Sequence, residues 1–306
     1  MKESEYLSET LSRYGLEGAN AEFIRHNENL TYNIGGEYLL RIHKPKDGFS
    51  AESVFCGYNR TALRRTELEL LKHLHDKGMT VQLPVQNADG DLVTVLSDGT
   101  AATMLKWIEG RILDKQEADV DLCREIGRMI ARIHRNSDGY NPAGTFRYDN
   151  ELCCGLAMRL EADRDLTGEE KYSYFRELLY RIGQELDGKQ MVYTHADLSW
   201  SNILLTKSGL VPIDFSLGGM CVPEMDLSAV FCGISDKELR RAIMEGYGMP
   251  LDGRMLDATF VLNILLGIVL HIGLWTKEEW FDRKCNTWKR EIFDPFLKGD
   301  EVIGLA

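Results

Sequence analysis

The most constraining feature of the sequence is a pair of short apolar segments joined by a tight turn. The segments are residues 203–205 and 210–213, and the Lys-Ser-Gly sequence between them is typical of a turn. Two antiparallel strands of this kind bring the residue before the first strand beside the residue after the second. We therefore expect Asn202 and Asp214 to lie close together.

Three residues in and around this hairpin have the chemistry that phosphoryl transfer requires. The reaction needs one carboxylate that orients the attacking hydroxyl, and oxygen ligands that hold Mg²⁺ on the nucleotide. Asp197, five residues before Asn202, fits the first role, and Asn202 and Asp214 fit the second. The pattern therefore predicts kinase chemistry. The alternative is a solvated loop in which these residues only cap turns.

The same residues resemble the motifs of the aminoglycoside phosphotransferase and choline kinase family, which has a two-lobed protein-kinase-like fold. The family's catalytic loop, His-Gly/Ala-Asp-x-x-x-x-Asn, is matched by His195, Asp197 and Asn202. Its Ile-Asp-Phe/Trp metal-binding segment is matched by residues 213–215, and Asp226 resembles the structural Asp that follows. The resemblance implies that His195 and Asp226 support the loop, and that the cofactors are ATP and Mg²⁺, with GTP left open.

Two further hairpins are expected near the amino terminus. Gly35 and Gly36 separate residues 30–34 from residues 38–42, and an Asp-Gly pair separates residues 92–96 from residues 102–107. A small antiparallel sheet follows from this pattern.

The chain is expected to be an α+β protein with two lobes. The sheet and one main helix, at about residues 61–76, would form a nucleotide-binding lobe of residues 1–107. A larger, mostly helical lobe of residues 108–306 would carry out catalysis and bind the substrate. Glu67 lies on the apolar stripe of the main helix, and a buried carboxylate is costly unless it is paired. We therefore expect a cation on the sheet, and Arg41 is the best candidate.

The resemblance implies that Arg41, held by Glu67, reaches the α and β phosphates of the nucleotide. Protein kinases usually have Lys at this position, so Lys44 or Lys46 is an alternative phosphate contact. The other possibility is an ordinary salt bridge between Arg41 and Glu67 with no ligand.

Other nucleotide contacts are expected in two connecting segments. Asn29 ends a polar loop where a phosphate-covering loop belongs in this fold. Lys106, Trp107 and Ile108 lie in a segment that resembles the hinge between lobes, where main-chain groups would meet the adenine ring.

The acceptor is expected to be a small molecule with a hydroxyl group. Only eight residues separate Asp214 from Pro223, which is too few for the segment on which a protein kinase holds a peptide. The leading candidate acceptor is an aminoglycoside-like amino sugar, and choline, ethanolamine and homoserine are alternatives. A nucleotide-binding pseudokinase and a protein-serine kinase of the same fold are further possibilities.

A cationic acceptor would suit the acidic and aromatic side chains of the carboxyl-terminal region. The alternative is that they are surface charges and core tryptophans. The residues concerned are Asp252, Asp257, Trp275, Glu278, Glu279, Trp280, Asp282, Trp288, Glu291 and Asp294.

Composition excludes several other classes of function. A net charge of −12 disfavours a nucleic-acid partner, which would need a basic face. Seven cysteines without Cys-x-x-Cys spacing suggest neither a disulfide framework nor a zinc site. The charged first residues lack the apolar core of a secretory signal, so we expect a cytoplasmic protein.

Residues 258–275 are nearly all apolar and about long enough to span a bilayer. Asn263 and His271 interrupt this segment, which favours a buried helix over a membrane span. These two residues lie eight apart on one helical face, and we expect them to be buried polar groups with satisfied hydrogen bonds rather than ligands.

Overall fold

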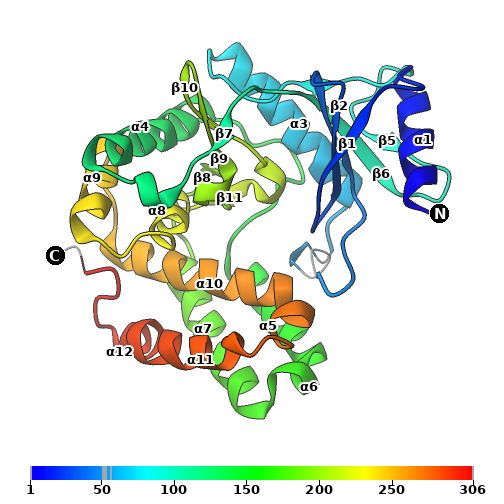
Figure 1. Cartoon of the computed structure of the whole chain (residues 1–306). Coiled ribbons are helices and arrows are strands. Elements are labelled where there is room, and N and C mark those ends of the chain that lie inside the picture. The colour runs from blue at the N-terminus through cyan, green and yellow to red at the C-terminus, as the bar shows by residue number, and fades with distance from the viewer. Residues whose placement is uncertain (1, 50–53, 56, 305–306) are drawn as a thin grey trace.

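The amino-terminal lobe is an antiparallel sheet with a helix on each side (Figure 1). The computed structural model describes residues 2–49, 54–55 and 57–304. The central strands follow the order β1-β2-β3-β6-β4, and β5 also pairs with β6. The elements are α1 (Glu3–Arg13), β1 (Ala21–His26), β2 (Leu30–Ile34), β3 (Tyr38–Ile42), α3 (Arg60–Asp76), β4 (Pro84–Val85), β5 (Thr94–Val95) and β6 (Ala101–Lys106).

The first predicted hairpin forms with the expected bounds, and the main helix begins one residue earlier than expected. The second hairpin is shorter, because only two residues of β5 pair with β6. Strand β1 was not predicted. Its two end residues are half-buried and the four between them are exposed, so it lacks the alternation by which a half-buried strand is recognised.

Strand β1 also contains a bulge, which lies beside a cavity of the candidate active site. Phe23 pairs with Tyr32 and Arg25 pairs with Thr31, so Ile24 is an extra residue without an opposite partner. Consecutive residues of a regular strand point to opposite faces, and a bulge changes that alternation. As a result, Ile24 and Arg25 both line the same cavity.

The carboxyl-terminal lobe is mostly helical and carries a three-stranded and a two-stranded sheet of short strands. It includes the predicted hairpin, β9–β10, which pairs with β7 on its other side. The elements are β7 (Arg111–Ile112), α4 (Val120–Asn136), α5 (Asn150–Ala162), α6 (Arg164–Thr167), α7 (Glu169–Leu186), β8 (Val192–Thr194), β9 (Ile203–Thr206), β10 (Gly209–Pro212), β11 (Gly219–Cys221), α8 (Glu224–Phe231), α9 (Lys237–Tyr247), α10 (Gly253–Trp275), α11 (Trp280–Trp288) and α12 (Asp294–Lys298).

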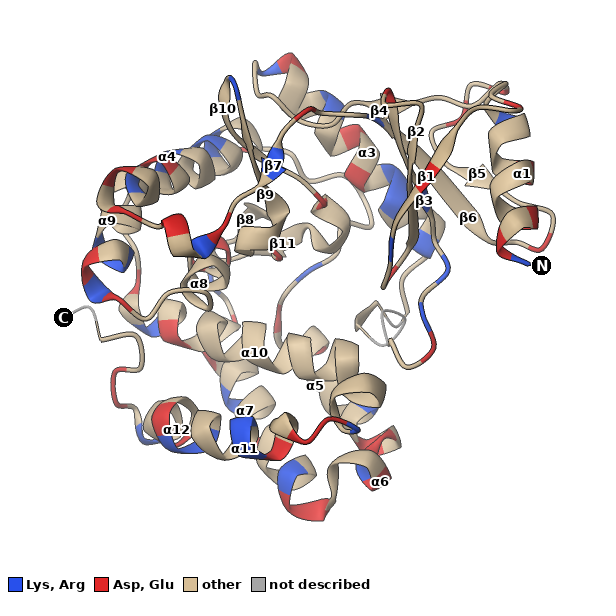
Figure 2. Ribbon diagram, in the orientation of Figure 1, with Lys and Arg blue, Asp and Glu red and all other residues tan. Residues whose placement is uncertain are grey.

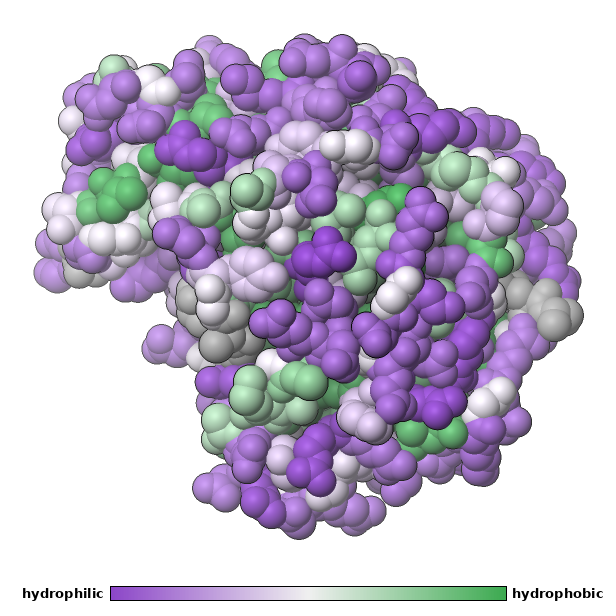
Figure 3. Space-filling model, turned by 180° about the vertical axis from the view of Figure 1, so that it is seen from behind, coloured by the Kyte–Doolittle hydropathy of each residue, from purple (hydrophilic) through white to green (hydrophobic). Residues whose placement is uncertain are grey.

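Helix α10 is the apolar segment noted in the sequence, and it forms the centre of the lobe (Figure 1). By length and composition it could cross a membrane, but 61% of its most apolar window is buried by the rest of the protein. The Asp252 side chain caps its first turn by accepting hydrogen bonds from the Arg254 and Met255 main-chain N–H groups. The helix is therefore a core element of this lobe. The opposite face of the molecule from Figure 1 is largely hydrophilic (Figure 3).

Helices α4 and α9 cross at two glycines. A Cβ atom on Gly127 would lie 2.0 Å from the Ile243 carbonyl oxygen, and one on Gly246 would lie 2.0 Å from the Arg124 carbonyl oxygen. The two backbones can approach this closely only without side chains at the crossing. The same helix pair carries His134 and Tyr247, which contact each other, and His134 also contacts Asp226 next to the candidate active site.

We expect Gly127→Ala to destabilise the protein by about 3 kcal/mol, because the helices must separate to admit the methyl group. Gly155→Ala is the matched control. Gly155 also lies within a helix, but its Cβ would meet nothing within 4 Å, so this change should be neutral or slightly stabilising. Chemical denaturation of both variants measures the difference, and equal stabilities would contradict the packing argument.

Candidate active site

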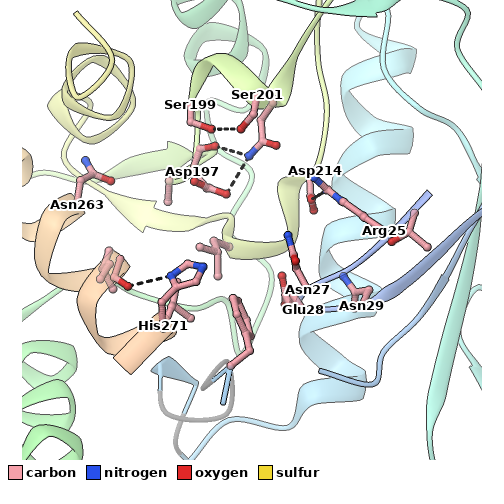
Figure 4. A pocket seen from close by; sticks show the side chains of 18 residues that line it. Arg25, Asn27, Glu28, Asn29, Asp197, Ser199, Ser201, Asp214, Asn263 and His271 are labelled. Atoms are coloured by element: carbon pink, nitrogen blue, oxygen red, sulfur yellow. Dashed lines mark hydrogen bonds and ion pairs between the residues drawn. The ribbon is translucent and has the colours of Figure 1, made fainter. Parts of the chain in front are cut away.

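The β9–β10 hairpin brings the predicted metal ligands to one place. The Ile213 N–H donates a hydrogen bond to the Asn202 carbonyl oxygen at 2.9 Å. Asp214 follows directly and has a left-handed backbone conformation, with φ of 65°. Both side chains line one cavity together with Asp197 (Figure 4).

Asp197 is held by the amide of Asn202. The Asn202 Nδ2 donates to the Asp197 Oδ2 at 2.9 Å and to the Asp197 carbonyl oxygen at 2.8 Å (Figure 4). These bonds use the side-chain nitrogen, so the side-chain oxygen of Asn202, Oδ1, is the atom that can serve as a cation ligand.

Asp226 holds the backbone that precedes Asp197. Its buried carboxylate accepts hydrogen bonds from the main-chain N–H groups of His195, at 2.9 Å, and Ala196, at 2.7 Å. Ala196 has φ of 61°, a conformation that residues other than glycine rarely adopt. These two hydrogen bonds therefore fix a strained turn that aims Asp197 into the cavity.

Two histidines complete this support. The Nε2 of His134 donates to Asp226 at 3.0 Å, and the Tyr247 hydroxyl contacts its Nδ1 at 2.9 Å. The His195 Nε2 donates to the Ile213 carbonyl oxygen at 2.9 Å, which ties the catalytic loop to the hairpin. The contact of His134 with Asp226 was not foreseen from the sequence.

The electrostatics of the cavity suit Asp197 to proton transfer. Burial and the carboxylates of Asp214 and Glu28 raise the pKa of Asp197 to about 7, and the hydrogen bond from Asn202 lowers it in part. A carboxyl group that titrates near neutral pH can accept a proton from a substrate hydroxyl more readily than an ordinary Asp.

Asp214 lies between two arginines. Its Oδ2 is 2.9 Å from Arg25 and its Oδ1 is 3.4 Å from Arg41, which is itself 2.9 Å from the Glu67 carboxylate. Burial raises the pKa of Asp214, but the two guanidinium groups outweigh it and hold the pKa below the usual value. The ion pair expected between Glu67 and a cation on the sheet is thus present.

Arg25 and Glu28 are site residues that sequence reasoning missed. Glu28 accepts a hydrogen bond from the Ser216 hydroxyl at 3.3 Å, and burial and Asp214 raise its pKa to about 7. Its position in a polar loop next to Asn29 was the only available signal. Arg25 had no such signal, because its orientation depends on the bulge in β1.

Two adjoining cavities meet at Asp214. The first has a volume of about 370 Å³ and lies between the sheet and β7–β9. The second has a volume of about 290 Å³ and lies between Asp197 and α10. Four residues line both cavities, and they are Arg25, Asn29, Thr31 and Asp214.

The predicted nucleotide contacts are only partly brought together. Trp107 and Ile108 line the first cavity, as do Arg41 and Asn29. The Asn29 oxygen already accepts a hydrogen bond from His43 Nδ1 at 2.7 Å. The Lys106 side chain is not among the lining residues, and its ammonium group lies over the Tyr38 ring at 4.3 Å.

Lys44, one of the two alternative phosphate contacts, donates to the hydroxyl of Tyr6 on α1 at 3.1 Å. Its ammonium group also lies 4.7 Å from the centre of the Tyr6 ring. The structure therefore favours Arg41 over Lys44 as the cation beside Asp214.

The acidic residues of the carboxyl-terminal region do not line either cavity in the described part of the chain. Asp252 caps α10, and Asp257 accepts hydrogen bonds from the Val302 and Ile303 N–H groups. Acidic residues are scattered over the ribbon of both lobes (Figure 2). The alternative reading of this set, as surface and structural charges, is the one that the geometry supports.

Asn202 and Asp214 offer oxygen ligands of the kind that Mg²⁺ prefers. No group of three or more His, Cys, Asp or Glu residues in the described chain could hold a metal alone. A cation here would need further oxygens, which nucleotide phosphates provide. The donor set therefore fits Mg²⁺ that is bound together with a nucleotide.

Comparison with known proteins agrees with this geometry. Residues 20–257 match the phosphotransferase enzyme family. The chain belongs to this family. Its two-lobed α+β architecture confirms the predicted protein-kinase-like fold.

Solved structures of small-molecule kinases share the fold at low sequence identity. An amicoumacin kinase in complex with AMP-PNP and Ca²⁺ has a TM-score of 0.73 at 17% identity, with 96% of this chain and 94% of that chain covered. A microcompartment-associated aminopropanol kinase has a TM-score of 0.70 at 20% identity, with 98% and 99% covered.

Curated relatives in the family match over shorter lengths. A homoserine kinase from Rhizobium etli (strain CIAT 652) is 40% identical over 214 residues, which is 64% of each protein. A homoserine kinase from Sinorhizobium medicae is 31% identical over 120 residues, which is 39% of this chain and 32% of that protein. The chain thus matches only about a third of the length of the Sinorhizobium medicae homoserine kinase and of two similar homoserine kinases.

We expect Asp226→Asn to lower both stability and turnover. The amide places an NH₂ group against a main-chain N–H that now donates to a carboxylate oxygen, so stability should fall by about 3 kcal/mol. The kcat should fall more than about tenfold, because the turn at Ala196 loses its support.

Asp236→Asn is the control for this variant. Asp236 caps α9 by accepting hydrogen bonds from two N–H groups, and Asn caps helices about as well as Asp. Thermal unfolding and steady-state kinetics of the two variants are the measurements. An Asp226 variant with normal kcat would show that the loop does not depend on this carboxylate.

Proposed function

We propose that this phosphotransferase uses ATP and Mg²⁺ to phosphorylate a hydroxyl group of a small, amine-bearing molecule. The observation that carries the proposal is the position of Asp214 at the junction of two cavities, with Asp197 lining the second of them. A nucleotide in the first cavity would place its phosphates beside Asp214. An acceptor in the second would place its hydroxyl beside Asp197.

Asp197 would accept the proton of the acceptor hydroxyl. As that proton leaves, the hydroxyl oxygen forms a bond to the γ-phosphorus, and the bond from this phosphorus to the β–γ bridging oxygen breaks. ADP and a phosphate ester are the products. Asn202 and Asp214 would hold Mg²⁺, which supplies charge neutralisation for the phosphates when it is bound.

The first cavity has the character of a nucleotide site. Apolar side chains of Ile24, Leu39 and Leu204 could cover a base, and Trp107 and Ile108 lie at the connection between the lobes. The buried Nε and Nη2 groups of Arg41 have no hydrogen-bond partner in the described chain. Buried donors are rarely left unpaired, so these groups are suited to phosphate oxygens.

The second cavity favours a small acceptor. Its volume of about 290 Å³ is just below the range of ligand pockets, which is roughly 300–1,000 Å³. The carboxylates of Asp197 and Glu28 suit an amine. Amino alcohols or homoserine therefore fit better than an aminoglycoside, for which the acidic residues outside the cavity were the main argument. Because such kinases draw on cellular ATP, the proposal also implies a cytoplasmic enzyme.

We expect Asp197→Asn to reduce kcat by about 10²–10⁴-fold and to leave nucleotide affinity nearly unchanged, because the lost group acts on the acceptor proton. Asp121→Asn, at a carboxyl group whose side chain is 94% exposed, is the control. The assay is product mass after incubation with ATP, Mg²⁺ and a panel of amino alcohols, choline, homoserine and aminoglycosides, with calorimetry for nucleotide binding.

Wild-type turnover in the Asn variant would overturn the role of Asp197. ATP binding without any phosphorylated product would favour a pseudokinase. Phosphorylation of the chain itself or of a peptide would favour a protein-serine kinase.

We expect Arg25→Ala to raise the KM for ATP about tenfold, because Arg25 lines both cavities and can exchange Asp214 for a phosphate. Arg13→Ala is the matched control. Its side chain is 44% exposed, against 46% for Arg25, and its ion pair with Asp89 lies away from the cleft. Steady-state kinetics at saturating acceptor give the result, and an unchanged or lower KM for ATP would show that Arg25 only neutralises Asp214.

A further inference from the structure

The wall of the second cavity opposite the catalytic loop is one face of α10. Asn263, Leu266, Gly267, Leu270 and His271 line it. Asn263 and His271 are hydrogen-bonded to different partners, but both are only half-buried and face the cavity, so the prediction that both are buried is wrong (Figure 4). They are the polar groups of an otherwise apolar wall.

The hydrogen bonding of His271 fixes its tautomer. Its Nδ1 lies 2.9 Å from the Gly267 carbonyl oxygen, which can only accept, so Nδ1 carries the proton. The Nε2 of a neutral imidazole is then a hydrogen-bond acceptor. No hydrogen bond to this Nε2 occurs within the described ranges, and the ring reaches into the cavity (Figure 4).

The surroundings of His271 keep the ring neutral and in place. Burial lowers the pKa of His271 below its usual value. The imidazole stacks on Trp275 at 4.6 Å, with 7° between the planes, and the edge of Phe49 packs against it at 5.0 Å. A ring held on two sides presents its free nitrogen in one direction.

Asn263 adds a second acceptor to the same wall. Its Nδ2 donates to the Ser228 hydroxyl at 2.9 Å and to the Thr259 carbonyl oxygen at 3.0 Å. The amide nitrogen is therefore used inside the lobe, and the carbonyl oxygen remains for the cavity.

The charges that line the cavity also disfavour a ligand that carries a carboxylate. Asp197, Asp214 and Glu28 contribute carboxyl groups, whereas Arg25 is the only Lys or Arg among the described lining residues and is paired with Asp214. A ligand carboxylate bound here would face acceptor atoms and negative charge, without a free cation to pair with.

We propose that Nε2 of His271 accepts a hydrogen bond from the amine of the acceptor, and that this wall selects amino alcohols over acceptors that also carry a carboxylate. This inference rests on the proposed function, because it concerns the acceptor of that reaction. It separates this chain from homoserine kinases, whose substrate is an amino alcohol with a carboxylate.

A matched pair of acceptors tests the selection. The compound 3-aminopropan-1-ol is homoserine without its carboxyl group, so the two differ only in the group at issue. We expect the wild-type enzyme to show a kcat/KM at least about tenfold higher for 3-aminopropan-1-ol.

Variants of His271 test the residue itself. His271→Phe keeps an aromatic ring against Trp275 and removes the acceptor, so the KM for 3-aminopropan-1-ol should rise about 10–100-fold with kcat and the KM for ATP little changed. His271→Gln restores an acceptor oxygen and should recover part of the affinity. Thermal unfolding of both variants confirms that the lobe is intact.

The outcomes separate this inference from the proposed function. A preference for homoserine, an unchanged KM in the Phe variant, or no turnover of either compound would overturn the role of His271. Each of these results leaves the proposed kinase activity standing if another acceptor is phosphorylated in an Asp197-dependent way. Loss of Asp197 dependence would overturn the proposed function instead.

Discussion

The hydrogen bonds of the buried Asp226 carboxylate hold the loop that carries Asp197. The carboxylate accepts two main-chain N–H groups at a turn where Ala196 has a positive φ, and it receives a third hydrogen bond from His134. A strained backbone conformation persists only when its surroundings determine it fully. Because His134 lies on α4 and contacts Tyr247 on α9, the packing of these helices is linked directly to the aim of Asp197.

The site is also a balance of charge between the two lobes. Arg25 and Arg41 from the sheet converge on Asp214 from the helical lobe, and Glu67 from α3 holds Arg41 in position. Arg25 and Asp214 also line both cavities, the one between the sheet and β7–β9 and the one bounded by α10. Binding, positioning and the support of the fold thus involve overlapping residues.

The sequence predicted those parts of the site that depend on local pattern. The β9–β10 hairpin, the closeness of Asn202 and Asp214, and the pairing of Glu67 with a cation followed from turn residues and apolar periodicity. Arg25 could not be foreseen, because a bulge decides which way it points. The role of Asp257 was equally hidden, since its partners are main-chain groups of a loop 45 residues later.

The ion pair between Arg25 and Asp214 implies a thermodynamic linkage between metal and nucleotide. While Arg25 neutralises the Asp214 carboxylate, this carboxylate binds a divalent cation less strongly. A nucleotide whose phosphates pair with Arg25 would release Asp214, which could then bind the cation. Each partner would then raise the affinity of the other by the same factor, as reciprocity between two sites requires. The enzyme would thus favour the metal–nucleotide complex over either component alone.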